Sequence, residues 1–572
     1  MGLVAQRRLV AVGALLLTVF AIWRAGIGAD FGDGTHVVAL AMRMAQGDMP
    51  LADEMNLQAL GSLPAVPFTW VWLSTVGVDG IVLASRLWYV ALALLAGVLG
   101  YRALRTGFGP VGSFVAVTLM MLPTPYSLLV TSYNTVPVLG LALATCTAFA
   151  AWRVRSGRWA ALSGVALALT ALAHPAMVPP AMVLLAMVVV VGRGPVARGV
   201  LTGALGTALV IVVAVALGPG VGALGETLRY TAEYQSARLT AFERLTLSAE
   251  MHRNGLLVWR NVPALLLAVA AGLPWTSQRW RALLATGSVV ALSIAVVGAS
   301  LQQPPTEELL LGSVAAALVV LAAVLLLPFL VTARDLGEDR LRVLLVLTAP
   351  TAVVGFVAVS LVSSASAKWG VAAAPVQPLF GAAALVVLLF VARHHVRAVA
   401  LLAALALLGS LVVVHPMRSF RDVQPHRLDG RVEDGPLAGL LTHEAYLQED
   451  CELRAAVRDW VDPDDSVFFW AAPAGYVYAD APMSTHNIWV ADFGAASAAG
   501  VEWMTRTDRW PDVAFVHAGA LASAGGWEAL AARDPVIARL DAHYGEPTEV
   551  DGFVVLRRDG GVRADGPAPQ GC

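Results

Sequence analysis

Long apolar stretches alternate with shorter polar connections from the N-terminus to residue 415. A helix that crosses a bilayer needs roughly 20 predominantly apolar residues, and about thirteen stretches meet that requirement. We expect membrane-spanning helices at residues 9–27, 79–101, 110–128, 134–151, 159–174, 176–192, 199–218, 256–274, 282–301, 309–332, 343–362, 373–392 and 398–415. The pattern therefore predicts an α-helical polytopic membrane domain at residues 1–415.

The pattern changes after residue 415. Residues 416–572 are polar and richer in Asp, Pro and Gly, and short runs of β-branched and aromatic residues alternate with helical patterns. We expect strands at Ser466–Trp470, Val513–His517 and Phe553–Arg557, and helices near 447–461, 495–505 and 526–533. Strands that alternate with helices predict a small α/β domain, followed from Gly560 by a disordered tail.

Composition agrees with a membrane protein. Hydrophobic residues make up 58% of the chain and charged residues 14%, whereas soluble domains carry about 25% charged residues. A net charge of −2 argues against nucleic acid as a partner. Three isolated cysteines predict neither a zinc cluster nor a redox pair, although Cys451 and Cys572 could form a disulfide if the C-terminal domain lies outside the cytoplasm.

Arginines fall in every second connection between the predicted spans, beginning with Arg7 and Arg8, and the short connections between them are nearly free of arginine. Because arginine near span ends marks the cytoplasmic side, we place the N-terminus in the cytoplasm. The long connections 28–78 and 219–255 and the C-terminal domain then lie outside. Segment 219–255 also has the periodicity of interfacial helices.

The first extracytoplasmic loop, residues 28–78, concentrates polar side chains between short apolar runs. Residues 34–46 have helical periodicity, and their broad apolar side is expected to lie in the membrane interface. Asp33, His36 and Arg43 share the opposite stripe, because they are spaced three and seven residues apart. This spacing predicts an interfacial helix that presents three polar side chains on one face.

A second interfacial helix is expected to begin at Asp53 and Glu54 and to carry Asn56 and Gln58. Asp33 and Asp53 would each begin a helix, where a capping aspartate is common. Capping and catalysis therefore remain open for both carboxylates.

Two cations near predicted span ends are candidates for binding an anion. Arg86 lies inside the outer end of the second span, where a charge is costly and often functional. Lys368, the only lysine of the chain, lies in an outside connection beside Trp369. For both side chains the alternative is snorkelling to the interface.

The first loop resembles that of the GT-C fold glycosyltransferases, which include protein O-mannosyltransferases, the aminoarabinose transferase of lipid A and mycobacterial arabinosyl- and mannosyltransferases. The resemblance rests on an acidic residue that opens the helix, a Gly-x-x-Pro turn, a Pro-rich second segment and an Arg-Leu pair, here at residues 33–39, 47–50, 53–54, 64–68 and 86–87. Residues 435–489 are similar to the extracytoplasmic tail of some bacterial members. One departure is that the Asp-Glu pair of the family is Asp33-Gly34 here, so a partner carboxylate would come from Asp30, Asp53 or Glu54.

This resemblance implies transfer of a sugar from a polyprenyl-phosphate donor to an acceptor outside the membrane, usually with inversion. The acceptor would be a cell-envelope glycan, lipid or protein. A carboxylate beside the acceptor hydroxyl can serve as general base, and Asp33 is our candidate. Cations would stabilise the leaving phosphate. The residues expected to bind donor or acceptor are His36, Arg43, Asp53, Glu54, Asn56, Gln58, Arg86 and Lys368.

We expect no cofactor and no metal site, although the carboxylates of the first loop are of the type that binds Mg²⁺ or Mn²⁺. Two other classes remain open. A transporter or lipid flippase would carry ionisable residues at mid-span and paired broken helices, whereas the predicted spans are almost free of charge. A non-catalytic membrane scaffold would leave the clustered carboxylates unexplained.

Overall fold

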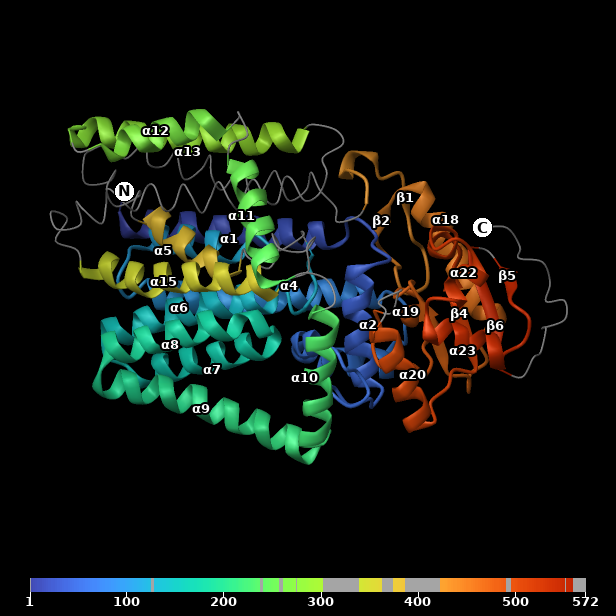
Figure 1. Ribbon diagram of the computed structural model, residues 1–572. Coiled ribbons are helices and arrows are strands. Elements are labelled where there is room, and N and C mark those ends of the chain that lie inside the picture. Colours follow the sequence, from blue (N-terminus) through green and yellow to red (C-terminus); the bar gives the residue numbers. More distant parts are fainter. Residues whose placement is uncertain are drawn as a thin grey trace.

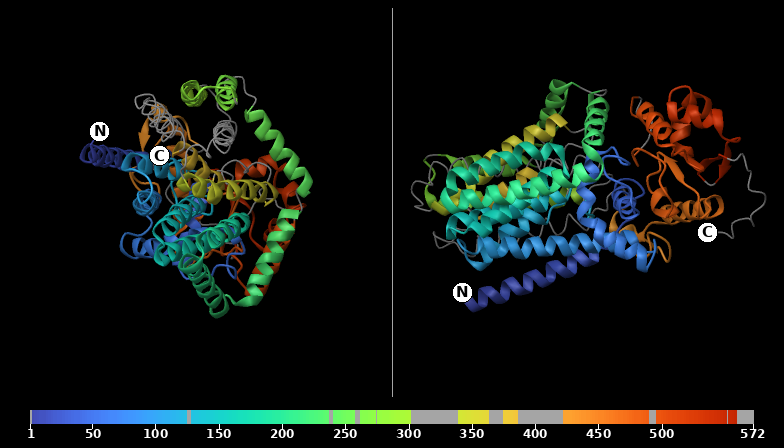
Figure 2. Two further views of the ribbon diagram at one scale, coloured as in Figure 1. Left: turned by 90° about the vertical axis from the view of Figure 1, so that its left-hand side faces the viewer. Right: turned by 90° about the horizontal axis from the view of Figure 1, so that it is seen from below.

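The computed structural model describes residues 2–124, 128–236, 240–256, 261–273, 275–301, 339–362, 374–385, 422–489, 495–550 and 552–558. A bundle of long helices forms one part, and a smaller domain with a β-sheet forms the other (Figure 1). The first loop lies between these two parts, as the right-hand view of Figure 2 shows.

Six helices of the described residues are long and apolar enough to cross a membrane: Leu3–Ala25 (α1), Ile81–Leu104 (α4), Val136–Val154 (α6), Pro175–Gly192 (η3, Pro175–Met177, and α8, Val178–Gly192), Gly194–Leu217 (α9) and Asp339–Leu361 within α15 (Asp339–Val362). Shorter apolar helices are Pro110–Met121 (α5), Gly157–Ala173 (α7), Val262–Ala271 within α12 (Val262–Gly272), Thr286–Ala295 within α13 (Gln278–Leu301), and Ala374–Leu385. The multi-span prediction is confirmed. The ranges 309–332 and 398–415 lie outside the described residues, so the total of about thirteen spans stays a prediction.

Small residues let the helices of the bundle approach closely. In α6, 72% of the most apolar window is buried inside the protein, and five of the 19 residues of this helix are Ala. Gly164 of α7 faces α9, and a Cβ atom there would lie 2.2 Å from the carbonyl oxygen of Val200. Such backbone contact is the usual way in which helices pack where burial of apolar surface supplies no driving force.

Three helical segments form the first loop: α2 (Asp33–Ala45), the 3-10 helix η1 (Leu57–Ala65) and α3 (Val66–Thr75). The first interfacial helix was expected to sink its apolar side into lipid, and that prediction is wrong. Val37, Leu40 and Met42 instead pack in one hydrophobic core with residues of the C-terminal domain. The protein itself covers α2 because the C-terminal domain lies against it (Figure 1).

The prediction of a second helix that begins at Asp53 is also wrong. Residues 51–54 form turns with an isolated β-bridge between Pro50 and Glu54. The helix begins later, at Leu57, where Asn56 is the N-cap and accepts a hydrogen bond from the backbone N–H of Gln58. Asparagine competes well for this capping position.

The second long connection forms two helices, α10 (Gly220–Ser236) and α11 (Ala241–Leu256). Both run across the direction of the bundle helices, and α10 lies beside the C-terminal domain (Figure 1). The helical periodicity predicted for this segment is therefore confirmed.

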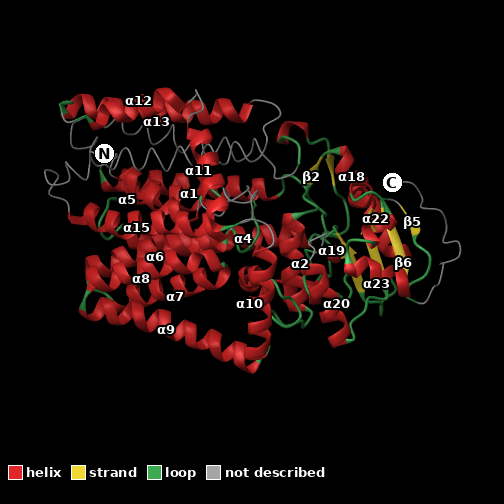
Figure 3. Cartoon of the chain, viewed as in Figure 1, coloured by secondary structure: helices red, strands yellow, loops and turns green. Residues whose placement is uncertain are grey.

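The C-terminal domain contains a four-stranded sheet in the order β3-β4-β6-β5. Its strands are β3 (Val467–Trp470), β4 (Val513–His517), β5 (Thr548–Val550) and β6 (Phe553–Arg557). Strand β3 is parallel to β4, with Phe469 opposite Phe515, and the other pairs are antiparallel. The three predicted strands coincide with β3, β4 and β6, which confirms the small α/β region (Figure 3).

Helices cover both faces of this sheet. They are α18 (Glu444–Trp460), α19 (Gly475–Ala479), α20 (Ala495–Thr507), α21 (Ala518–Ser523), α22 (Trp527–Ala531) and α23 (Pro535–His543). Because side chains alternate across a strand, Phe469 joins the core that contains α2, whereas Phe468 and Trp470 join the core that contains α20 and α23. One sheet face therefore packs toward the first loop.

A small hairpin of the C-terminal domain extends the end of α1. It consists of β1 (Gly430–Arg431) and β2 (Leu441–Thr442). The Gly28 N–H donates to the carbonyl of Leu441, and the Leu441 N–H donates to the carbonyl of Gly26, each at 2.8 Å. These backbone bonds fix the chain that leads from the first span into α2.

Candidate functional site

Asp30, and not Asp33, caps helix α2. The Asp30 carboxylate accepts hydrogen bonds from the backbone N–H groups of Gly32, at 2.8 Å, and of Gly34. A Cβ atom at residue 34 would lie 2.8 Å from Oδ2 of Asp30, so any other side chain there would disturb this contact. The Asp33-Gly34 pair therefore has a local cause: glycine at 34 allows the buried Asp30 carboxylate to reach the helix end.

Asp33 is the first residue of α2, and its side chain is partly exposed. The capping position before it belongs to Gly32, which carries no side chain. The N-terminus of a helix carries partial positive charge, which favours a carboxylate beside it. Asp33 is therefore the first helical residue of α2 and not its N-cap residue, and α2 lies at the junction between the bundle and the C-terminal domain (Figure 1).

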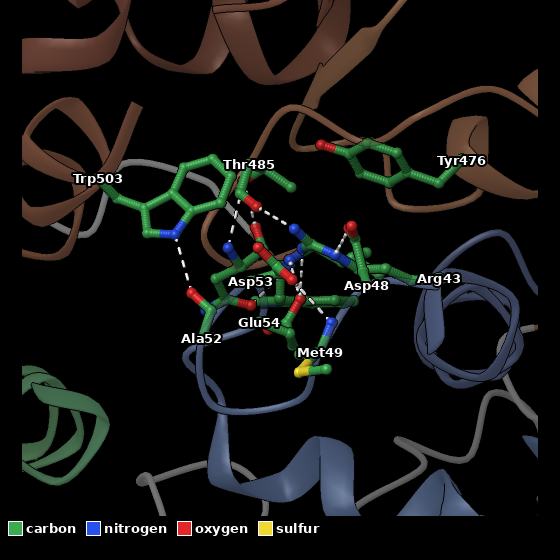
Figure 4. Close-up of polar contacts among 12 residues, drawn as sticks. Arg43, Asp48, Met49, Ala52, Asp53, Glu54, Tyr476, Thr485 and Trp503 are labelled. Carbon is green, nitrogen blue, oxygen red and sulfur yellow. Dashed lines mark hydrogen bonds and ion pairs between the residues drawn. The ribbon is translucent and has the colours of Figure 1, made fainter. Parts of the chain in front are cut away.

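Arg43 is the centre of a buried ionic network (Figure 4). It is 1% exposed, and its guanidinium contacts Asp48 at 2.8 Å and Glu54 at 2.9 Å. Its Nη2 donates to the carbonyl oxygen of Thr485 at 2.6 Å. Since a buried charge is stable only when it is paired, this network holds the end of α2, the following turn and the C-terminal domain together.

Glu54 is the buried carboxylate of this network. Burial raises its pKa to about 7, although Arg43 and the backbone N–H of Ile488 act in the opposite direction. Among the described residues its Oε1 has no hydrogen-bond partner, whereas Oε2 accepts from both Arg43 and Ile488. Glu54 therefore joins α2 to the C-terminal domain through its contacts with Arg43 and Ile488.

The C-terminal domain contributes residues 484–489, which we name the docking loop. Besides the contacts with Arg43 and Glu54, the carbonyl of His486 accepts from the Met55 N–H at 2.7 Å. Asn487 Nδ2 donates to the Tyr230 hydroxyl of α10 at 3.1 Å. The docking loop therefore binds the first loop and the second long connection at once.

His36 follows Asp33 by one helical turn and packs against the docking loop. Its ring meets that of Trp489 edge-on, with centroids 5.1 Å apart. Burial lowers the pKa of His36 to about 3, so the imidazole is neutral at physiological pH. Within the described part of the chain its Nδ1 has no hydrogen-bond partner. His36 can therefore offer one neutral donor or acceptor but no charge.

Asp53 lies on the outside of the same network. Its carboxylate accepts from the Met49 N–H at 2.7 Å and pairs with Arg509 at 3.1 Å. Arg509 also binds Asp48, and the indole N–H of Trp503 donates to the carbonyl of Ala52. The turn before Glu54 is thereby fixed to the C-terminal domain.

Arg86 lies where the sequence places it, near the start of α4, and it is buried. Its Nη1 donates to the carbonyl oxygens of Ala25 and Ile27, each at 3.1 Å. Arg24 at the end of α1 also bonds Ile27. These two guanidinium groups line a small cavity with Asp30 and Gly34. Two positive groups thus gather at the end of α1 that faces Asp30.

The structure separates the predicted residues into groups. Asp33 and His36 lie on one turn of α2, and Arg43, Asp53 and Glu54 belong to the ionic network. Asn56 caps η1, with Gln58 as its partner. Lys368 lies outside the described residues. Within the described residues no group of three or more His, Cys, Asp or Glu side chains could hold a metal ion.

Three polar residues near the start of the first loop are not among those predicted from the sequence: Arg24, Asp422 and His443. Arg24 could have been found, because it is a charge at the end of a predicted span, as Arg86 is. Asp422 binds the Ala29 N–H at 2.8 Å and lies 2.6 Å from Nδ1 of His443. Nothing local in the sequence distinguishes this pair from ordinary polar residues of a soluble domain.

Comparison with solved structures aligned the whole chain with ArnT from Cupriavidus metallidurans. The apo structure matches with 14% identity and a TM-score of 0.39, covering 98% of this chain and 100% of that one. The structure bound to undecaprenyl phosphate matches with 12% identity and a TM-score of 0.41, covering 98% and 99%. No protein-family model matches the chain, and no curated protein matches it. At these values the likeness describes only the general course of the chain, and we base no step of the mechanism on it.

Proposed function

We propose that the chain is an integral membrane glycosyltransferase. It transfers a sugar from a polyprenyl-phosphate donor to an extracytoplasmic acceptor, which is a cell-envelope glycan, lipid or protein. The donor class follows from the resemblance of the first loop to GT-C enzymes, and Asp33 is the general base.

The observation that carries the proposal is the position of Asp33. It is the first residue of α2 and is partly exposed, whereas the rest of that helix as far as Arg43 is buried. A carboxylate on a buried, well-packed helix is held in place, which a general base requires. The junction of bundle and domain is also where a lipid-linked sugar would meet a polar acceptor.

The reaction that fits this site is a displacement with inversion. The acceptor hydroxyl oxygen forms a bond to the anomeric carbon while the bond from that carbon to the phosphate oxygen breaks. The hydroxyl proton passes to Asp33, and polyprenyl phosphate leaves with the bonding electron pair. Arg86 and Arg24 offer positive charge near Asp30 for the leaving phosphate, and Lys368 stays a further candidate.

His36 would contribute through its neutral ring. Its ring packs edge-on against Trp489 of the docking loop, so it would help to hold the start of α2 in position. Arg43, Asp53 and Glu54 would act indirectly, by holding α2 and the docking loop together.

We place the N-terminus in the cytoplasm and the C-terminal domain outside, from the arginine alternation. Cys451 is disulfide-bonded and Cys146 is a free thiol. A disulfide in the C-terminal domain suits an oxidising compartment outside the cytoplasm.

The test is a transfer assay on purified protein in lipid nanodiscs. Radiolabelled polyprenyl-phosphate sugars are supplied with an extract of envelope glycans, lipids and proteins as acceptors. The proposal predicts that label leaves the lipid and appears covalently on an acceptor. A transporter or flippase would move the labelled lipid across a vesicle membrane with its sugar still attached, and that result would contradict the proposal.

A further inference from the structure

A groove of about 250 Å³ lies between α10 and α20, apart from Asp33 and His36. Glu226, Arg229 and Glu233 line it from α10, at a spacing of three and seven residues that puts them on one helix face. Glu502 and Arg506 line it from α20, four residues apart. Two polar helix faces therefore form its walls.

The floor of the groove is apolar and rigid. It consists of Met55 from the first loop, Tyr230 and Trp503, and all three are buried. The indole of Trp503 donates a hydrogen bond to the carbonyl of Ala52, and the guanidinium carbons of Arg43 and Arg509 lie 6.0 and 5.9 Å from the centroid of its ring. A fixed floor keeps the shape of the groove independent of its occupant.

The charges of the walls nearly cancel. Three carboxylates and two guanidinium groups line the groove, and Glu226 pairs with Arg506 across it at 2.6 Å. The carboxylates would repel an anion, and the guanidinium groups would repel a cation. A neutral ligand with many hydroxyls can use both, since each hydroxyl donates to a carboxylate and accepts from a guanidinium.

The groove is joined to the candidate site through the docking loop. The Tyr230 hydroxyl accepts from Asn487, and the Asn487 side chain accepts from the N–H of Trp489. Trp489 in turn packs against His36 on the helix that begins at Asp33. A ligand in the groove therefore lies against the same rigid loop that borders the proposed reaction centre.

We propose that this groove is a subsite for the acceptor and takes its saccharide portion, a neutral oligosaccharide. The inference rests on the proposed function and narrows it, because it selects a glycan or glycolipid among the acceptor classes. The groove would hold sugar units remote from the reacting hydroxyl, and their binding would orient that hydroxyl toward Asp33.

The test is direct binding, measured by isothermal titration calorimetry on the full chain in nanodiscs. The probes are linear neutral oligosaccharides of glucose, mannose, galactose and arabinose. We expect at least one of them to bind. Glu502→Ala removes an exposed wall carboxylate, so it should weaken binding about tenfold, the cost of one hydrogen bond to a charged group, and leave thermal unfolding unchanged.

Glu546→Ala is the matched control, because Glu546 is an exposed glutamate of the same domain outside the groove. It should bind the probe as the wild type does. Failure of every probe to bind, or equal binding by the Glu502→Ala protein, would overturn the groove assignment. Asp33→Asn should retain oligosaccharide binding while losing transfer, and retained transfer would remove Asp33 as the base without touching the groove. A wild-type protein that binds the oligosaccharide but transfers no sugar would overturn the proposed function alone.

Discussion

At the scale of single residues, two neighbouring aspartates occupy different positions at the start of α2. Asp30 is 3% exposed and satisfies two backbone N–H groups at the start of α2. Asp33 lies three residues later and is partly exposed. A sequence does not show which of two neighbouring carboxylates accepts the backbone N–H groups at a helix start, so the assignment of this role to Asp30 required the structure.

Replacement of Asp30 should therefore destabilise the protein. Asp30→Ala removes a cap, at a cost of about 0.5–2 kcal/mol, and leaves two buried N–H groups without their acceptor. We expect a lower midpoint of thermal unfolding in detergent. The exposed residue Asp429 provides a control, since Asp429→Ala should change stability by less than about 0.5 kcal/mol. Equal midpoints for the two variants would show that Asp30 does not cap α2.

At the scale of elements, the end of α2 is locked to the docking loop through Arg43 and Glu54. The folded pKa of Glu54 is raised to about 7 from 4.5. Between these values the folded protein binds more protons at Glu54 than the unfolded chain does. The stability that Glu54 contributes is thus fully present below pH 4.5 and is lost as the pH rises through about 7.

Glu54→Gln should remove this pH dependence. Glutamine keeps an acceptor oxygen for Arg43 and Ile488 but does not titrate. We expect the wild type to lose stability from pH 5 to pH 8 by on the order of 2 kcal/mol more than the variant does. Denaturant unfolding at several pH values measures the difference. Glu546→Gln, at an exposed position, should follow the wild type, and a Glu54→Gln curve that also follows it would refute the assignment.

Elements were predictable where local pattern decides them. The helix of the first loop was expected at residues 34–46 and is observed at Asp33–Ala45, and three strands match. The environment of that helix was not predictable, because its polar face is covered by Thr485, which lies 442 residues from Arg43 in the chain. The second helix was misplaced because Asp53 accepts from Met49 within a turn, which resembles a cap in sequence.

At the scale of the whole molecule, the C-terminal domain packs against the first loop and holds it in its observed conformation. It covers α2, extends the end of α1 through β2 and contacts α10 through the docking loop. Composition separates this domain from the bundle, yet nothing in composition shows the contact. The candidate site is therefore built from both ends of the chain.

The proposed orientation is testable with reporter fusions. A reporter fused after Arg397 should be active in the cytoplasm, and one fused at Gly475 should be active outside, because arginine-rich connections remain inside. Fluorescence or phosphatase activity of the fusions reads out each location. The opposite location for either fusion would contradict the arrangement of spans.

The most direct measurement of the central claim is the turnover rate of Asp33→Asn in the nanodisc transfer assay. Asparagine cannot accept the hydroxyl proton, so we predict a loss of at least about 100-fold in kcat, the usual contribution of a general base, with thermal unfolding and oligosaccharide binding unchanged. A variant that turns over at the wild-type rate would contradict the assignment of Asp33 as the base.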